Sequence, residues 1–216
     1  MASSVDAAQH KLMVEMALPC VIHPILRELE ENSSASSPTL IKEAFDTVEN
    51  FYPGFTEFFI SRVLLKAQVE HRVDMAEAIL KLEGSGKQRD VKLRRTEPAF
   101  KNLQHRADSL KLILGRIPAE IADRKKFLDT IKDIAQAIKH LLDSVNDSFT
   151  QLSVIEDRNR LDKKKRDFVK YSKRFSTTLK DFFKDNSEKQ MMRRSAVYLS
   201  ANHLVHQTNQ ILLAVG

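Results

Sequence analysis

Four long segments in the second half of the chain repeat their core positions every three or four residues. This spacing is typical of a helix that buries one face. The stripes are Phe100, Leu103, Ala107, Leu110, Leu114 and Ile117; Phe127, Ile131, Ile134, Ile138, Leu141 and Val145; Leu161, Phe168, Ser172, Phe175, Leu179 and Phe182; and Val197, Ala201, Leu204, Thr208, Ile211 and Val215. Short connections between four such helices predict an antiparallel four-helix bundle over residues 99–216.

The first half of the chain predicts a smaller helical module over residues 11–83. Its helices are expected at 11–31 with interruptions at Pro19 and Pro24, from Pro38 to about Asn50, from Thr56 to Ala67, and over 70–82. The turn before the third of these helices is Tyr52-Pro53-Gly54. Residues 84–98 are expected to form a basic hinge, with a short helix in its middle.

The third helix of this module is apolar around most of its circumference. Its apolar residues are Phe55, Phe58, Phe59, Ile60, Val63, Leu64 and Leu65. Such a helix is buried on several sides, but a module of about 70 residues buries little more than half of its unfolded surface. Dimerisation through this module solves the problem. The alternative is that the C-terminal domain covers the helix.

Composition supports an all-α, globular protein. Hydrophobic residues make up 42% and charged residues 30%, with only 5 glycines and 6 prolines to break helices. Residues 1–84 carry 7 Lys+Arg against 13 Asp+Glu, whereas residues 85–216 carry 28 against 16. This split favours two modules with different partners. The basic half is suited to acidic peptides, anionic lipids or nucleic acid.

Location is expected to be cytoplasmic. Cys20 is the only cysteine, so no intrachain disulfide forms, as is usual in a reducing compartment. The N-terminal residues lack the basic and apolar regions of a secretory signal. No apolar run approaches the ~20 residues of a membrane span.

A pair of lysines recurs in the same place on the two middle bundle helices. Lys132 and Lys139 lie roughly 120–140° round from Phe127, and Lys173 and Lys180 lie at the same angles from Phe168. A small residue separates each pair: Ala135 in one helix and Ser176 in the other. Side by side, the helices would border a shallow groove suited to an acidic amphipathic helix. The alternative is that these lysines are ordinary solvated residues whose stems lie on the core.

The sequence contains little that indicates a catalytic site or a metal site. No nucleophile motif occurs, and Gly84-Ser85-Gly86-Lys87 lacks the spacing of a phosphate-binding loop. His203 and His206 have no acidic or cysteine partner nearby in sequence. We therefore expect no enzyme activity, metal or cofactor. The basic run 163–166 fits a nuclear address, a lipid-headgroup patch or a solvated helix start, and nucleic-acid binding ranks low because aromatic residues are not interleaved with it.

Several long segments resemble a known family. FLDTIKDIAQAIKHLLDSVN, DFVKYSKRFSTTLKDFFKD and SANHLVHQTNQIL, with HPILRELE, AFDTVENFYPGFT and RTEPAFKNL, resemble the family of programmed cell death protein 10, also called the third cerebral cavernous malformations protein. The resemblance covers the chain from about residue 17. Residues 1–16, 84–93 and 186–194 depart from the family pattern and receive no interpretation.

The resemblance implies an adaptor with an N-terminal dimerisation domain and a bundle of the focal-adhesion-targeting type. It implies dimer-interface positions at Ile41, Ala44, Val63 and Leu64, and a peptide-binding groove bordered by the four lysines. Implied partners are a second copy of the chain, germinal-centre type III Ste20-like kinases, striatin, the second cerebral cavernous malformations protein, paxillin-type leucine- and aspartate-rich helices, and phosphoinositides. Implied settings are the striatin-interacting phosphatase and kinase complex, the Golgi, the plasma membrane, cell polarity, lumen formation and apoptosis. The alternative function is a peripheral membrane protein whose basic bundle binds phosphoinositides.

Overall fold

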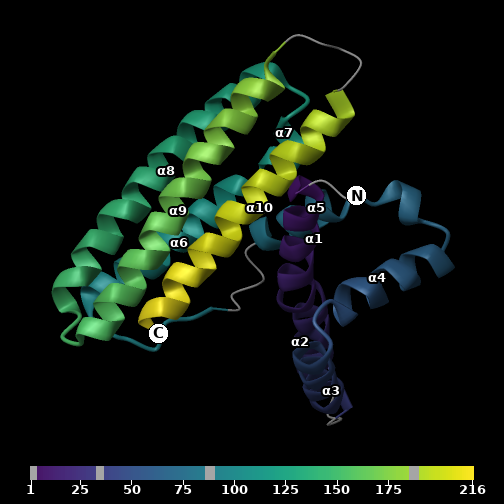
Figure 1. Cartoon of the computed structure of the whole chain (residues 1–216), viewed down its shortest axis with the longest axis horizontal. Helices are drawn as coiled ribbons and strands as arrows, with labels where there is room; N and C mark the ends of the chain where they lie inside the picture. Colours follow the sequence, from purple (N-terminus) through teal and green to yellow (C-terminus); the bar gives the residue numbers. More distant parts are fainter. Residues whose placement is uncertain (1–3, 33–36, 86–90, 185–189) are drawn as a thin grey trace. The chain divides into compact units, whose positions relative to one another are not determined.

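The computed structural model describes residues 4–32, 37–85, 91–184 and 190–216, and no strand occurs among them (Figure 1). The expected all-α fold is confirmed. The chain divides into two compact units, Met1–Leu82 and Glu83–Gly216. None of the helices in the described ranges is long and apolar enough to cross a membrane.

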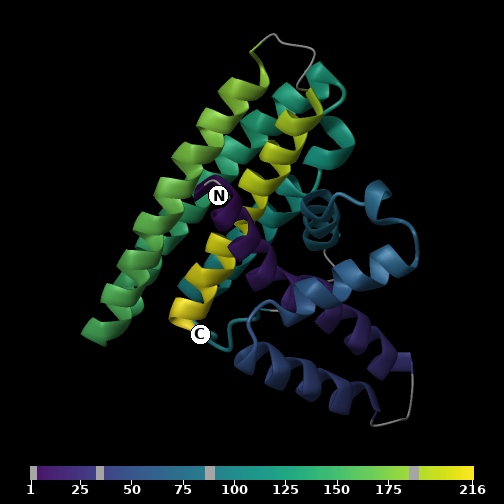
Figure 2. The ribbon, with the colours of Figure 1, turned by 45° about the vertical axis from the view of Figure 1, so that its right-hand side comes forward.

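The N-terminal unit contains short helices joined by tight turns. They are α1 (Ser4–Ala17), the π-helix η1 (Leu18–Ile22), α2 (His23–Asn32), α3 (Ser37–Phe51), α4 (Phe55–Lys66), the 3-10 turn η2 (Glu70–Arg72) and the start of α5 (Met75–Gly84). Within this unit α2 packs on α3, while α4 contacts α1, η1 and α3. Figure 2 shows α1 and α2 following one another in the dark part of the ribbon, with α3 running beside α2.

The interruption expected near Pro19 is present as a wider helical turn. Proline has no N–H to donate, so the regular backbone ladder cannot continue through Leu18–Ile22. The N–H of His23 donates instead to the carbonyl of Leu18, which is the five-residue step of a π-helix. Leu18 and Cys20 are buried on this turn, so the bend also contributes to the core of the unit.

The turn before α4 is fixed by a glycine and a carboxylate. Gly54 has φ +97°, a backbone conformation that residues with a Cβ rarely adopt. The Glu49 carboxylate accepts hydrogen bonds from the N–H of Gly54 (2.5 Å), the N–H of Thr56 (2.8 Å) and the Thr56 hydroxyl (2.6 Å). Burial opposes ionisation of this carboxyl, but the hydrogen bonds outweigh burial and lower the pKa of Glu49.

The prediction of a continuous helix over residues 70–82 is wrong. The structure has the 3-10 turn η2, an extended residue at Val73, and then α5. Asp74 explains the new start, because its carboxylate accepts hydrogen bonds from the N–H groups of Ala76 and Glu77. The short helix expected in the hinge is also absent from residues 91–97, while residues 86–90 lie outside the described residues.

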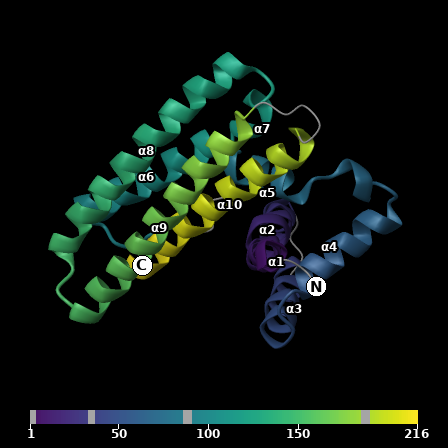
Figure 3. The ribbon, with the colours of Figure 1, turned by 45° about the horizontal axis from the view of Figure 1, so that its top comes forward.

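The C-terminal unit is an antiparallel bundle of four long helices (Figure 3). They are α6 (Pro98–Leu114), α8 (Arg124–Gln151), α9 (Ile155–Phe182) and α10 (Gln190–Val215), with the single turn α7 (Ile117–Glu120) after α6. Helix α6 packs on α8 and α10, and α9 packs on α10. Most stripe positions are buried as expected, including Phe100, Phe127, Phe168 and Phe175, each at most 2% exposed.

Candidate functional site

The N-terminal unit exposes a set of large apolar side chains on helices α2, α3 and α4 and in the turn after α3. We call it the apolar surface, and its large exposed side chains are Ile25, Leu29, Leu40, Ile41, Phe51, Tyr52, Phe58, Phe59, Val63 and Leu65. Their exposed fractions run from 40% for Phe59 to 76% for Phe51. Isolated exposed apolar residues are ordinary, but a group of this size in one small unit is typical of a protein–protein interface.

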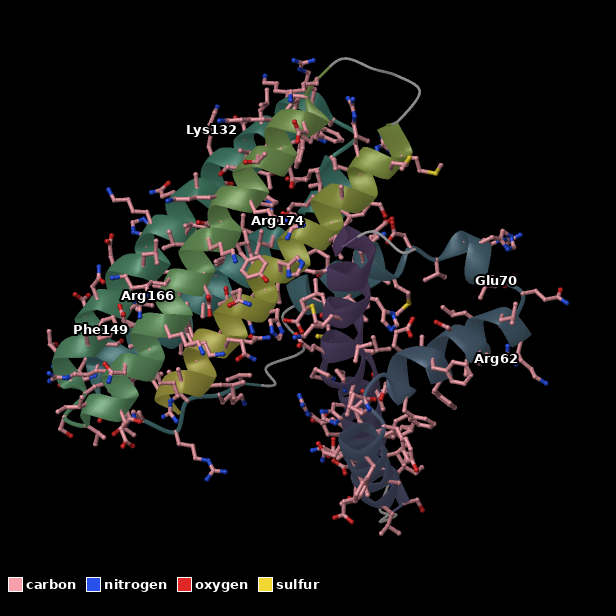
Figure 4. The ribbon with its side chains drawn as sticks, viewed as in Figure 1. Arg62, Glu70, Lys132, Phe149, Arg166 and Arg174 are labelled. Atoms are coloured by element: carbon pink, nitrogen blue, oxygen red, sulfur yellow. The ribbon has the colours of Figure 1, made fainter. Side chains whose placement is uncertain are left out.

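Helix α4 buries few of its own residues. Only Thr56 and Ile60 are buried, although apolar residues surround the helix. Phe59 packs edge-on against Phe45 of α3, with ring centroids 5.4 Å apart, and this contact orients α4 on its neighbour. Arg62, labelled in Figure 4, lies over the Phe58 ring at 5.8 Å. Phe58 and Phe59 are nevertheless 59% and 40% exposed, so their rings remain available to a partner.

The four predicted interface residues lie on α3 and α4, two of the three helices that carry the apolar surface. Ile41 and Ala44 are exposed on α3, Val63 is exposed on α4, and Leu64 is half-buried. The predicted set omits larger exposed side chains, notably Phe51, Tyr52 and Leu40. The sequence held a signal for Phe58, because α4 is apolar on all sides, but nothing in the periodicity of α3 distinguished exposed Leu40 from a core leucine.

The six predicted groove residues lie on exposed positions of α8 and α9. We call the surface that they outline the α8–α9 face: Lys132, Ala135 and Lys139 on α8, and Lys173, Ser176 and Lys180 on α9. Within the described ranges, Lys139, Lys173 and Lys180 make no ion pair. Lys132 pairs with Asp129 at 2.9 Å, and this hydrogen bond raises the pKa of the lysine and lowers that of the carboxyl. Figure 4 shows Lys132 projecting from α8.

Helices α8 and α9 are joined near both ends of this face. At one end the Phe127 ring packs against Phe182 and Phe183, with centroids 5.5 and 5.8 Å apart. At the other end the Lys165 ammonium donates to the Asn146 side chain at 2.7 Å and lies 5.6 Å from the Phe149 ring. Over their whole lengths, α8 is in more extensive contact with α6, and α9 with α10, than α8 and α9 are with each other.

Partly exposed side chains lie on the facing sides of α8 and α9 between the lysines. Ile131 and Ile138 of α8, with Val169 and Ser172 of α9, are half-buried. Helical geometry places these residues between the core and the lysines. The Ser176 hydroxyl donates to the Ser172 carbonyl, so it is satisfied within its own helix. The arrangement offers a partly apolar strip with ammonium groups along its borders.

The other residues considered in the sequence have structural roles. The basic run 163–166 lies within α9 rather than at its start, because α9 begins at Ile155. Lys164 donates to Gln210 of α10 at 2.7 Å, and Arg166 pairs with Asp162. The His203 ring stacks on Tyr171 at 4.7 Å. Burial, then the charge of Arg174 and the neighbouring His206, lower the pKa of His203 to about 4.

A crevice that the sequence did not indicate lies between α6 and α8. It has a volume of about 180 Å³ and is lined by Arg106, Ser109, Ile113, Asp133, Gln136, Ala137 and His140. Asp133 is already paired with Arg116 at 2.9 Å. Among the described residues, no group of three or more His, Cys, Asp or Glu side chains is placed to hold a metal ion.

Comparison with known proteins gives two matches to family models and one to a curated relative. Residues 10–70 match the model described as programmed cell death protein 10, dimerisation domain. Residues 73–162 match the model described as programmed cell death protein 10, C-terminal. The chain is also 34% identical over 208 residues to the programmed cell death protein 10 homolog of Caenorhabditis elegans, with 93% of each chain covered.

Proposed function

The chain belongs to the programmed cell death protein 10 family, and we propose that it is a non-enzymatic adaptor that dimerises through its N-terminal unit and binds acidic helices through its bundle. In this role it heterodimerises with germinal-centre type III Ste20-like kinases. It links them to striatin, to the second cerebral cavernous malformations protein and to paxillin-type leucine- and aspartate-rich helices. The proposal needs no cofactor or metal.

The apolar surface is the observation that carries the proposal. Ten large hydrophobic side chains are at least 40% exposed within residues 25–65, and these residues fall inside the stretch that matches a dimerisation domain. Burying such side chains contributes roughly 25 cal/mol for each Å² of apolar area removed from water. A second helical surface of similar composition is the natural partner, and Ile41, Ala44, Val63 and Leu64 are proposed to lie in the contact.

A kinase tail is proposed to compete for the same surface. If the tail presents a similar apolar helical face, it covers α3 and α4 as a second copy does. Adding a tail peptide of a germinal-centre type III Ste20-like kinase should convert the homodimer into a heterodimer, and should raise the melting temperature because the ligand binds only the folded unit. Native mass spectrometry reads both species. A stable complex of intact homodimer plus tail would contradict a shared surface.

The α8–α9 face is proposed to receive a leucine- and aspartate-rich helix. The leucines would lie on the partly apolar strip near Ile131, Ile138 and Val169, with the aspartates beside the lysines. Helix-in-groove recognition of this kind draws most of its affinity from apolar contacts. The charges mainly set orientation and association rate. Three of the four lysines make no ion pair within the described residues, so they are available to a partner.

A charge-reversal variant tests this site. Changing Lys132, Lys139, Lys173 and Lys180 to aspartate should abolish binding of a labelled leucine- and aspartate-rich peptide, measured by fluorescence anisotropy. A single reversal should weaken binding by about 1 kcal/mol or less, and binding should fall as salt rises. The matched control reverses four exposed lysines elsewhere on the bundle: Lys101, Lys125, Lys163 and Lys170.

The two variants carry the same change in net charge, so their difference isolates the position of the lysines. Circular dichroism checks that both remain folded. Equal loss of binding in both variants would indicate a general charge effect. Unchanged binding in the variant of the α8–α9 face would indicate that its four lysines are ordinary solvated residues.

The cellular setting follows from the proposed partners. A dimeric adaptor that joins these kinases to striatin would act in the striatin-interacting phosphatase and kinase complex, in the cytoplasm, at the Golgi and at the plasma membrane. We propose roles in Golgi organisation, cell polarity, lumen formation and apoptosis. Affinity purification with mass spectrometry tests this setting, and recovery of neither kinase nor striatin would contradict it.

A further inference from the structure

The crevice between α6 and α8 lies apart from both surfaces described above. The two helices run side by side (Figures 1 and 3), and the crevice between them has a volume of about 180 Å³. Two small residues, Ser109 of α6 and Ala137 of α8, take part in its lining. Side chains of this size leave a space between packed helices that larger ones would fill.

One end of the crevice is occupied by an ion-pair network of the bundle itself. Asp133 lines this end, and its carboxylate accepts a hydrogen bond from Arg116 at 2.9 Å. Arg116 also pairs with Glu120 at 3.0 Å, and the hydrogen bonds to Glu120 and Asp133 raise the pKa of Arg116. One guanidinium between two carboxylates leaves a net negative charge, so this end does not favour an anionic group of a ligand.

The other end of the crevice presents a cation that the bundle does not use. Arg106 lies ten residues before Arg116 on α6, which is about 15 Å along the helix axis. It lines the crevice, is half-buried, and makes no hydrogen bond or ion pair within the described residues. A guanidinium can bind a carboxylate through two parallel N–H···O bonds. This end therefore suits a carboxylate.

The middle of the crevice offers mainly apolar contact. Ile113 is half-buried and Ala137 is 8% exposed, so a ligand would meet their methyl groups. The polar side chains beside them already have partners: Gln136 and His140 contact each other through their Nε2 atoms at 3.3 Å, and the Ser109 hydroxyl donates to a carbonyl of its own helix. A ligand group that lies here should therefore be apolar.

We propose that the crevice binds a small organic acid, with the carboxylate at Arg106 and a compact apolar group over Ile113 and Ala137. Pockets for drug-sized ligands usually measure about 300–1,000 Å³, so this smaller crevice suits a molecule of roughly ten non-hydrogen atoms. A helix of another protein would need a contact of about 1,000 Å², which the crevice does not provide. The site does not depend on the adaptor function, and it shares no residue with the apolar surface or the α8–α9 face.

Phenylacetate is a suitable probe, because it joins one carboxylate to one phenyl ring. Its neutral counterpart, 2-phenylacetamide, has nearly the same shape without the charge. Phenylacetate added to the full chain should shift the NMR signals of the Ile113 and Ala137 methyl groups, with a Kd on the order of 1 mM. The amide should bind about three- to fivefold more weakly, which is the contribution of one partly exposed charge pair.

Two substitutions separate the charge from the space. Arg106→Gln should weaken binding of the acid about three- to fivefold and leave the amide unchanged, so that the preference for the acid disappears. Arg174→Gln is its control, because Arg174 is exposed on α9 and makes no ion pair within the described residues. Ser109→Leu fills the crevice and should abolish binding of both probes.

Ser176→Leu is the control for Ser109→Leu. In both serines the hydroxyl donates to the carbonyl four residues earlier in the same helix, so both variants lose the same hydrogen bond. Ser176 lies on α9, away from the lining of the crevice, and its variant should bind phenylacetate as the unmodified chain does. Circular dichroism verifies folding of each variant.

Three results would overturn the proposal. The first is absence of shifts at the Ile113 and Ala137 methyl groups up to about 10 mM phenylacetate, roughly ten times the expected Kd. The second is an unchanged preference for the acid over the amide in Arg106→Gln, which would indicate that this guanidinium does not hold the carboxylate. The third is binding that persists in a folded Ser109→Leu variant, which would place the probe elsewhere on the chain.

Discussion

In the bundle, twenty-six hydrophobic side chains are buried and seven large ones are exposed, whereas in residues 1–82 ten are buried and ten large ones are exposed, counting described residues only. The bundle closes its core with four long helices. The N-terminal unit has helices of 15 residues or fewer. A unit of this size buries little more than half of its unfolded surface, so apolar side chains remain on its outside.

Apolar residues therefore have different roles in the two units. In the bundle, a phenylalanine stabilises the fold of its own unit. In the N-terminal unit, a phenylalanine on α4 is proposed to stabilise an assembly, and a monomer would leave it in water. Substitutions of the same kind should therefore have different consequences in the two units, and this expectation can be tested.

The largest effect is expected for truncating one phenylalanine in each unit. Phe168→Ala removes a ring that is fully buried in the bundle and should cost about 3–5 kcal/mol of unfolding free energy. Phe58→Ala removes a ring that is 59% exposed and should cost less than about 1 kcal/mol within its own unit, while weakening dimerisation. Hydrogen exchange with mass spectrometry reports each unit separately.

Val197→Ala serves as a control of the same class as Phe168→Ala, since Val197 is also fully buried in the bundle. It should destabilise the bundle by a smaller amount. Equal losses of unfolding free energy for Phe168→Ala and Phe58→Ala, each in its own unit, would contradict the claim that phenylalanines have different roles in the two units.

A smaller effect is expected from pH on the bundle. Burial, Arg174 and His206 lower the pKa of His203 to about 4, below the ordinary value of 6.5. Between these values the unfolded chain binds a proton that the folded bundle does not, so the unfolding free energy falls as pH falls. The loss should be about 2 kcal/mol between pH 8 and pH 5.

Denaturant unfolding at several pH values measures this dependence. His203→Phe keeps a ring against Tyr171 but cannot titrate, so its bundle should lose less stability over the same interval. An identical pH dependence in the variant would show that other groups are responsible.

The smallest effect is expected for the cap of α4 in the N-terminal unit. In Glu49→Gln, an NH2 group takes the place of one carboxylate oxygen, and this group cannot accept a hydrogen bond. The substitution should lower the unfolding free energy by about 1 kcal/mol. Because hydrogen bonds lower the pKa of Glu49 despite its burial, its contribution is present above pH 4.5 and is lost as pH falls through the lower folded pKa.

Protection of α4 against hydrogen exchange measures the change. Glu43→Gln on α3 is the control, since this exposed residue makes no such contact to the turn. A similar loss of protection in both variants would contradict a specific role for Glu49.

Periodicity predicted the bundle well because each long helix repeats its signal over many turns. It was less successful over residues 70–82, where one aspartate starts a helix and a short 3-10 turn precedes it. A local cap of this kind changes a boundary without altering the apolar pattern. The sequence also indicated the bend near Pro19, but the π-helical form of that bend depends on how the chain packs.

The sequence indicated some residues of the candidate surfaces and missed others. The exposure of the four lysines follows from their angular position on the helices. Whether a lysine is free to bind a partner depends on the carboxylates near it, and Lys132 is paired with Asp129. The apolar surface was recognised from α4, but Leu40, Phe51 and Tyr52 were missed because exposure of an apolar residue depends on packing between helices. The crevice between α6 and α8 involves residues of two helices, so no single segment could indicate it.

The central claim, that the N-terminal unit assembles through its apolar surface, is tested most directly by light scattering of the full chain. The unmodified protein should have twice the 24.7 kDa mass of one chain. The variant with Ile41, Ala44, Val63 and Leu64 changed to aspartate should have the mass of one chain and an intact bundle by hydrogen exchange, because unpaired charges in a dry interface cost several kcal/mol. Leu112→Asp, an exposed leucine on the bundle, should remain dimeric. A dimer that persists in the quadruple variant would contradict the assigned surface.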